Sequence, residues 1–169
     1  GQPIPINIEN GVAAMALAQI CGCTADELRY GMSSYHGVVR RFDFKIKNDK
    51  HVLLSDYAHH PKEIYQSAKS LKQLYSHRKI TAIFQPHLYS RTKDFYKDFA
   101  DALSQLDEVI LCDIYPAREL PIEGVTSKLI YDCLKDGVQK QMIHKEDLLD
   151  LARERDFDVL VILGAGDIE

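Results

Sequence analysis

The amino-acid sequence predicts an α/β domain of Rossmann-like type, with a mainly parallel sheet and helices on both faces. Three observations predict this fold. From residue 42 onward, short apolar runs typical of strands alternate with amphipathic segments typical of helices. The last run, 158–163, is almost wholly apolar, as a strand buried on both faces should be. Finally, the residues with binding or catalytic chemistry follow the strands, where ligands bind in open α/β sheets.

The first 36 residues have a different pattern from the rest. The alanine-rich stretch 10–20 predicts a helix with one apolar face. Thr24 and Glu27, three residues apart, have the spacing of a capping box and predict a second short helix. We therefore expect residues 1–36 to be the tail of a preceding domain and residues 37–169 to form a domain of their own.

The elements of the second domain follow in regular order. Two strands joined by a turn at 48–50 should form a β-hairpin, and Pro61 suits the first turn of the helix that follows it. We expect strands at 42–47, 51–55, 79–84, 108–114, 139–143 and 158–163, and helices at 61–77, 92–106, 127–135 and 146–155.

Composition excludes several classes of function. The net charge is −4 and the basic residues are scattered, so we expect no nucleic-acid partner. No apolar run approaches the roughly 20 residues that cross a bilayer, and the chain begins without the features of a signal peptide. We therefore expect no membrane contact, and a cytoplasmic location is expected from the interpretation of the cysteines as reduced thiols. The four cysteines lack metal-ligand spacing and are expected to be reduced and buried.

Four loops should meet at the carboxyl edge of the sheet, because each follows a predicted strand. They carry aspartates, histidines and arginines where a purely structural rim could be built from glycine, asparagine and serine. These loops are 56–61, 85–91, 115–124 and 164–167.

Several residues of these loops allow two interpretations. Asp56 is either the cap of the next helix or a ligand of a ribose hydroxyl or a cation. Of His59 and His60, one is expected to be structural, and the pair has no third ligand at zinc spacing, so no metal site is predicted. Arg91 stands at a helix start, where the helix dipole disfavours a cation, and is therefore interpreted as an anion ligand. The 164–166 turn is too short for a dinucleotide fingerprint, and the chain has no Walker phosphate-binding motif.

Six segments together resemble the Mur ligases. They match the family's motifs in the family's order, across nearly the whole chain. The segments read NIENGVAA at 7–14, GVVRRF at 37–42, DYAHHP at 56–61, FQPHLYSR at 84–91, PIEG at 121–124 and LGAGDI at 163–168.

The resemblance implies a parent enzyme of three domains, of which this chain is the C-terminal part. It is similar to the branch of the family that joins L-alanine to UDP-N-acetylmuramate in peptidoglycan precursor synthesis. An N-terminal domain would bind the UDP-sugar, a central domain would bind ATP and Mg²⁺, and the C-terminal domain would close over both. The muramoyl carboxylate would be phosphorylated by ATP and then attacked by the alanine amine. This chain alone would be inactive and would hold no cofactor.

Residue roles follow from the same resemblance. Asn10 would hydrogen-bond the adenine with Asn7 nearby, Arg41 would approach the ATP phosphates, and Asp56 would approach the ribose hydroxyls. In the alanine site, the resemblance places Tyr57, His59, His87 and Arg91. Among these, His59, His87 and Arg91 would be catalytic, and the planar fork of Arg91 would hold the alanine carboxylate.

The sequence departs from the family pattern at three positions. Leu88 stands where the family usually has arginine. Either Arg118 or Arg91 would take over that charge, or this position would be less important than the frequency of arginine there suggests. Ile6 replaces a histidine and Gly11 replaces an alanine near the adenine-binding asparagines.

Other functions remain open at this point. A murein-peptide ligase, which recycles a tripeptide onto the same UDP-sugar, shares the DYAHHP-type loop but not the second loop. A non-catalytic binding module could have kept the fold and lost the chemistry. A nicotinamide-dependent oxidoreductase would need a glycine-rich turn after the first strand, which this sequence lacks.

Overall fold

The computed structural model describes the backbone of residues 5–168 and the side chains of residues 8–168. The chain divides into two compact units between Val38 and Val39. The first unit is a pair of helices, α1 (Pro5–Ile20) and α2 (Ala25–Ser34). The predicted capping box at the start of α2 is confirmed, since Thr24 Oγ1 accepts from the Glu27 amide at 3.3 Å and Glu27 accepts from the Thr24 amide at 2.8 Å.

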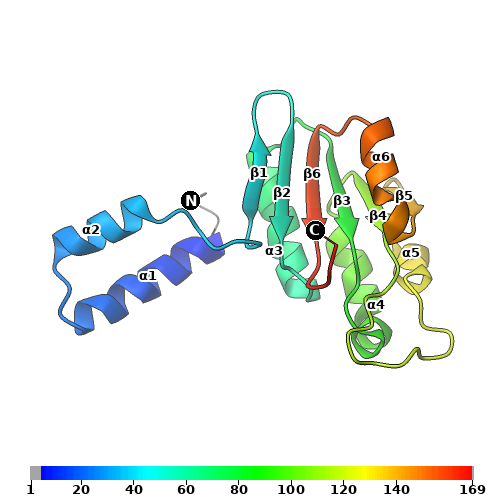
Figure 1. Cartoon of the computed structure of the whole chain (residues 1–169), viewed down its shortest axis with the longest axis horizontal. Helices are drawn as coiled ribbons and strands as arrows, with labels where there is room; N and C mark the ends of the chain where they lie inside the picture. The colour runs from blue at the N-terminus through cyan, green and yellow to red at the C-terminus, as the bar shows by residue number, and fades with distance from the viewer. Residues whose placement is uncertain (1–4, 169) are drawn as a thin grey trace. The chain divides into compact units, whose positions relative to one another are not determined.

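The second unit is a six-stranded sheet with helices around it (Figure 1). The strands lie in the order β1-β2-β6-β3-β4-β5; only the β1–β2 pair is antiparallel, which confirms the predicted hairpin. The elements are β1 (Asp43–Lys47), β2 (Val52–Asp56), α3 (Pro61–Leu74), β3 (Ile80–Phe84), α4 (Tyr89–Leu103), β4 (Glu108–Leu111), α5 (Lys128–Cys133), β5 (Gln139–Met142), the 3₁₀ turn η1 (Lys145–Asp147), α6 (Leu148–Glu154) and β6 (Val159–Leu163).

The core lies on both faces of the central strands, which explains their nearly continuous apolar sequences. On one face, Phe84 of β3 packs against Phe99 of α4 with ring centroids 5.3 Å apart. On the other face, Leu148 and Leu151 from the region of α6 pack against the cluster that contains Ile110. Helices on both faces of a mostly parallel sheet confirm the predicted fold class.

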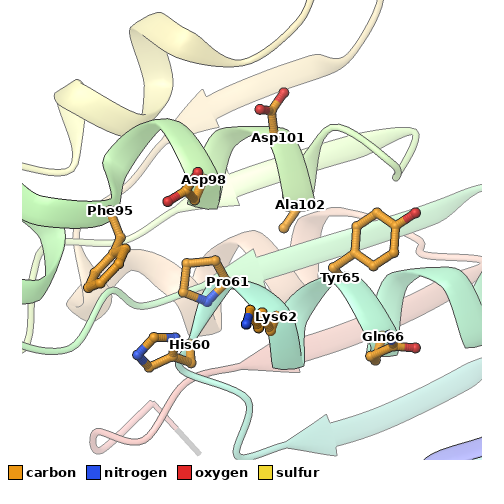
Figure 2. Close-up of a pocket in the computed structure, with 9 residues that line it drawn as sticks. All are labelled: His60, Pro61, Lys62, Tyr65, Gln66, Phe95, Asp98, Asp101 and Ala102. Carbon is orange, nitrogen blue, oxygen red and sulfur yellow. The ribbon is translucent and has the colours of Figure 1, made fainter.

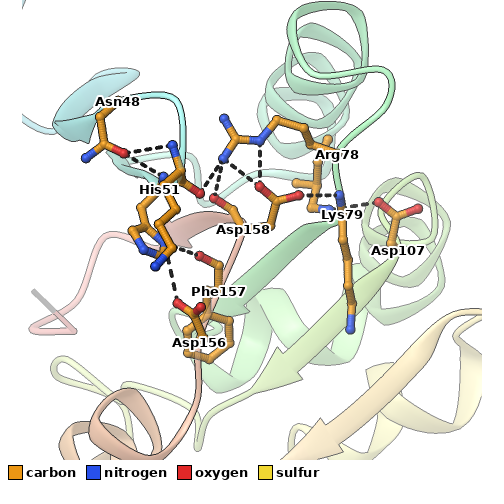
Figure 3. A network of polar contacts seen from close by, with 10 residues as sticks. Asn48, His51, Arg78, Lys79, Asp107, Asp156, Phe157 and Asp158 are labelled. Atoms are coloured by element: carbon orange, nitrogen blue, oxygen red, sulfur yellow. Dashed lines mark hydrogen bonds and ion pairs between the residues drawn. The ribbon is translucent and has the colours of Figure 1, made fainter.

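A polar network closes the amino edge of the sheet (Figure 3). Asp158, just before β6, accepts a hydrogen bond from Arg78 Nε at 2.5 Å and one from the Lys79 amide at 3.1 Å. Arg78 also donates to the Lys50 carbonyl oxygen in the hairpin turn at 2.8 Å. The network therefore joins the starts of β3 and β6 to the β1–β2 turn, at the edge opposite the predicted site.

The prediction that the cysteines are buried is wrong for three of the four residues. Cys112 is buried, and its burial raises the pKa of its thiol to about 12. The other three, Cys21, Cys23 and Cys133, are free and exposed. Cys133 ends the short helix α5, so its apolar neighbours in sequence face the core while its own side chain points outward.

Candidate active site

Strand register brings three of the predicted loops to one level. Asp56 at the end of β2 and Phe84 at the end of β3 both pair with Leu163 at the end of β6. The loops that follow these strands therefore begin side by side. The loop after β4 joins them through a parallel bridge between His87 and Tyr115.

A line of aromatic rings connects these loops. The Tyr57 and His59 rings meet edge to face, with centroids 5.2 Å apart. The His59 and His87 centroids are 6.1 Å apart, and His87 stacks on Tyr115 at 5.5 Å with an interplanar angle of 27°. Three of the residues predicted for the alanine site are thus brought together.

Arg91 joins this cluster from the first turn of α4. Its Nη1 atom lies 3.4 Å from His87 Nδ1 and 3.5 Å from the His87 carbonyl oxygen. The sequence placed the start of this helix at residue 92, which is wrong, because α4 begins at Tyr89. The helix begins earlier because Leu88, with φ of 76°, is its N-cap residue. The Leu88 carbonyl oxygen accepts the first helical hydrogen bond, from the Thr92 amide at 3.1 Å.

The surroundings of His87 favour its neutral form. Its pKa is lowered from the ordinary value by burial first, then by the positive charge of Arg91 and by His59. A guanidinium can only donate hydrogen bonds, so the ring nitrogen that faces it, Nδ1, must accept. The remaining proton of the neutral imidazole then lies on Nε2.

The two histidines of the DYAHHP loop have different surroundings. His59 Nδ1 lies 2.9 Å from the Tyr57 carbonyl oxygen, and its ring faces His87. His60 is the N-cap of α3 and its ring packs 5.2 Å from that of Phe95 on α4. Glu63 accepts hydrogen bonds from both histidine amides, at 3.0 and 3.1 Å. The His60 ring therefore packs against α4, whereas the His59 ring faces the line of rings.

Asp56 faces the domain interior and does not cap α3, whose N-cap is His60. One carboxylate oxygen accepts from the Ser67 hydroxyl, and the other accepts from the Ala58 amide at 3.3 Å. Burial raises the pKa of Asp56 in spite of these hydrogen bonds. Each carboxylate oxygen has two lone pairs, so Asp56 keeps the capacity to accept a bond from a further donor.

The two adjacent arginines have different positions. Arg40 is half-buried, its guanidinium lies 5.0 Å from the Tyr57 ring centroid, and its Nη2 donates to the carbonyl oxygens of Gly164 at 3.2 Å and Gly166 at 3.1 Å. Arg41 is exposed, with its guanidinium 6.0 Å from the same ring. Sequence reasoning missed Arg40, since only the backbone turn, with φ of 63° at Arg40, decides which arginine points inward.

The remaining predicted residues lie elsewhere. Asn10 is exposed on α1, in the first unit. Asn7 also belongs to α1, and its side chain lies outside the described residues. Arg118 is exposed in the loop after β4.

Within residues 8–168, no three histidine, cysteine or acidic side chains gather closely enough to hold a metal ion. None of the helices described is long and apolar enough to cross a bilayer. A cavity of about 410 Å³ lies between α3 and α4 (Figure 2). Its walls are mainly apolar, with Lys62, Asp98 and Asp101 among the polar residues. His60 and Pro61, which also line it, belong to the same loop as Tyr57 and His59.

Residues 40–166 match the Mur ligase, glutamate ligase domain, a span that includes the first three loops and residues 164–166 of the fourth. The chain belongs to the Mur ligase family. The family resemblance of the sequence motifs is thereby confirmed.

Relatives within the Mur ligase family match the chain along its whole length. It is 67% identical to a UDP-N-acetylmuramate–L-alanine ligase of Phocaeicola vulgatus over 169 residues and 53% identical to one of Porphyromonas gingivalis over 170 residues. A crystal structure of UDP-N-acetylmuramate-alanine ligase from Thermotoga maritima superposes with a TM-score of 0.80 at 28% identity, covering 99% of this chain and 36% of that one. The chain spans 37% of the length of the first two relatives. A murein peptide ligase from Psychrobacter arcticus shares the fold at 19% identity.

Proposed function

We propose that this chain is the C-terminal part of an ATP-dependent ligase that joins L-alanine to UDP-N-acetylmuramate, in cytoplasmic synthesis of the peptidoglycan precursor. Support comes from the relatives of that name, which match all of its residues at up to 67% identity. In the proposed reaction, the muramoyl carboxylate takes the γ-phosphoryl group of ATP. The amine of alanine then attacks the acyl carbon, the amide bond forms, and inorganic phosphate leaves with the C–O bond electrons.

The observation that carries the alanine-binding role is the position of Arg91 beside a neutral His87. Arg91 offers a planar fork of N–H donors that fits a carboxylate bidentately. A neutral imidazole 3.4 Å away does not compete for that fork as an anion would. His59 and Tyr57 continue the wall of the site along the line of rings. Arg91 would therefore hold the alanine carboxylate and fix its amine near the histidines.

The histidines would serve the amine. Alanine is an ammonium ion at neutral pH and must lose a proton before it can attack. A neutral imidazole can accept that proton at the ring nitrogen that carries no hydrogen. On His87 that nitrogen, Nδ1, faces the Arg91 guanidinium, so His87 would instead donate a hydrogen bond to the substrate from Nε2. His59, whose Nδ1 lies near the Tyr57 carbonyl oxygen, would leave Nε2 for the substrate.

The nucleotide would be shared with a preceding domain. Exposed Arg41 would contact its phosphates, Asp56 the ribose hydroxyls, and Asn10, with Asn7 nearby, the adenine. A magnesium ion would neutralise phosphate charge, and the central domain would supply its ligands. The chain alone is therefore expected to fold but to release no phosphate.

The first unit would belong to that preceding central domain, with residues 1–36 as its tail and 37–169 as the closing domain. In support, several apolar side chains of α1 are more than half exposed, as they would be in a helix that packs against further protein. These are Ile8, Val12, Leu17 and Ile20.

The test is phosphate release by the full-length protein with ATP, UDP-N-acetylmuramate and L-alanine. Arg91→Ala should raise the KM for alanine by on the order of a hundredfold, for a lost charged bidentate contact of about 3 kcal/mol. Arg91→Lys should recover part of the loss, and Lys93→Ala, which removes an exposed cation of the same helix, should change nothing. Release only with a tripeptide would instead indicate the recycling ligase, and no release with any amine would indicate a binding module.

A further inference from the structure

We propose that Tyr115 is a positioning residue for His87, and that Gly166 has no side chain because the Tyr115 ring must pack directly on its backbone. The contribution of Tyr115 to catalysis rests on the function proposed above; its effect on the His87 ring does not.

The backbone of Tyr115 encloses His87 on both sides. The Tyr115 amide donates to the carbonyl oxygen of Pro86 at 2.8 Å, and the Tyr115 carbonyl oxygen accepts from the Leu88 amide at 2.9 Å. These bonds bracket His87 and set the two side chains next to each other, with their rings stacked 5.5 Å apart. One face of the imidazole is thus covered by Tyr115, while Nδ1 faces Arg91.

Behind the ring, Gly166 leaves no room for a methyl group. A Cβ atom at this position would lie 2.8 Å from Tyr115 Cγ, 3.0 Å from Tyr115 Cβ and 2.3 Å from Gln85 Oε1. Contacts below 3.0 Å require something to move, because real Cβ atoms do not approach so closely. The backbone of Gly166 itself does not lie in the left-handed region, so an alanine there would act through its bulk and not through backbone strain.

Hydrogen bonds and an ion pair also hold the turn that contains Gly166 in place. Arg40 donates to the Gly164 and Gly166 carbonyl oxygens, and buried Gln85 donates to Asp167 at 3.3 Å. Lys145 also pairs with Asp167 at 2.6 Å. A methyl group at 166 would therefore push on Tyr115 and Gln85, because the turn is bonded in place. Any displacement of Tyr115 passes to His87 through the stacked rings and the shared backbone bonds.

The test follows the His87 imidazole by NMR titration of the 169-residue chain, with His87→Gln used only to assign its signal. Tyr115→Leu should remove the ring-current shift and open one imidazole face to water, so the pKa of His87 should move toward its ordinary value of 6.5. Arg91, His59 and Glu119, the charged or titratable groups that act on His87, are unchanged in this variant. Tyr115→Phe keeps the ring and should leave both readouts as they are.

Gly166→Ala provides a second route to the same result without altering either ring. It should shift the His87 signal and, in the full-length protein, lower kcat/KM for alanine on the order of tenfold or more, as expected for a misplaced reacting group. Gly31→Ala is the matched control, because a Cβ there meets nothing within 4 Å. An unchanged His87 titration in both Tyr115→Leu and Gly166→Ala would overturn the proposal. If instead the titration moves but the wild-type full-length protein releases no phosphate, the proposed function fails and the positioning role stands.

Discussion

Arg91 Nη1 lies 3.4 Å from His87 Nδ1, so the guanidinium and the imidazole are in direct contact. This pair links the two chemical tasks of the candidate site. The cation attracts a carboxylate, and by its charge it also keeps the neighbouring histidine neutral. One residue thereby supplies the binding group and also influences the protonation of the histidine beside it.

We predict that Arg91→Gln raises the pKa of His87. The value should stay below 6.5, because burial is the largest cause of its depression and is unaffected by the change. NMR titration of the chain measures it. Arg118→Gln should leave the pKa alone, since Arg118 is exposed and does not act on His87. The reverse pattern would mean that Arg118 compensates for the missing arginine at Leu88.

Asp56 gives a prediction about pH and stability. Its folded-state pKa is raised by burial, so the stability associated with its protonated form is complete below the unfolded value of 3.8 and is lost as pH rises through the folded value. Asp56→Asn cannot ionise and escapes this loss. Urea unfolding should therefore show the free energy of unfolding of Asp56→Asn gaining on that of the wild type as pH rises above about 4. Asp49→Asn, an exposed change in the hairpin turn, should track the wild type.

Replacing Glu108 should destabilise the domain less than replacing its partner Arg155. Its side chain is 6% exposed, and Arg155 Nη2 lies 2.6 Å from both of its carboxylate oxygens. Arg155→Ala leaves a buried carboxylate with only Lys79 and Thr81, and should cost about 3 kcal/mol. Glu108→Met leaves two partly exposed cations that water can solvate and one buried Thr81 hydroxyl without its acceptor, and should cost about 1 to 2 kcal/mol. Equal losses in urea unfolding would argue against this account.

Asp158 is expected to matter for stability and not for chemistry. Asp158→Ala leaves the Lys79 amide and the Arg78 guanidinium without their acceptor and should cost about 1.5 kcal/mol. Asp156→Ala is the control, because its carboxylate is 78% exposed and meets only His51 at 3.4 Å. Both variants should keep normal alanine kinetics in the full-length protein. A loss of activity at constant stability would connect the amino edge of the sheet to the site.

The sequence was sufficient for the parts of the fold that depend on periodicity. The alternation of strands and helices, the hairpin and the carboxyl-edge loops were all predictable, because burial imposes a period of two or 3.6 residues on them. The start of α4 was not, since Leu88 adopts a positive φ that a leucine rarely takes and that no local pattern indicates. The exposure of Cys133 was missed for a similar reason: one apolar stretch contained both a core face and a surface face.

The candidate site divides in the same way. The carboxyl-edge rule predicted that Tyr57, His59, His87 and Arg91 lie on neighbouring loops, and the strand register agrees. Their roles in an alanine site came from the family resemblance and stay a prediction. Tyr115 and Arg40 were missed because their contacts join loops far apart in the chain, and neither residue type is unusual in its own segment. Packing around a glycine, such as that of Tyr115 on Gly166, leaves no signal in a single sequence.

The outer strand β5 has one more consequence. All four of its side chains are exposed, and it lies at an open edge of the sheet, where unpaired backbone groups could recruit another chain. Its sequence, Gln139 to Met142, is mostly polar and places Lys140 in the middle. Two copies joined along this edge would have to strip water from the glutamines and from Lys140, whose ammonium group contacts Tyr131. The strand thus protects concentrated protein against edge-to-edge aggregation.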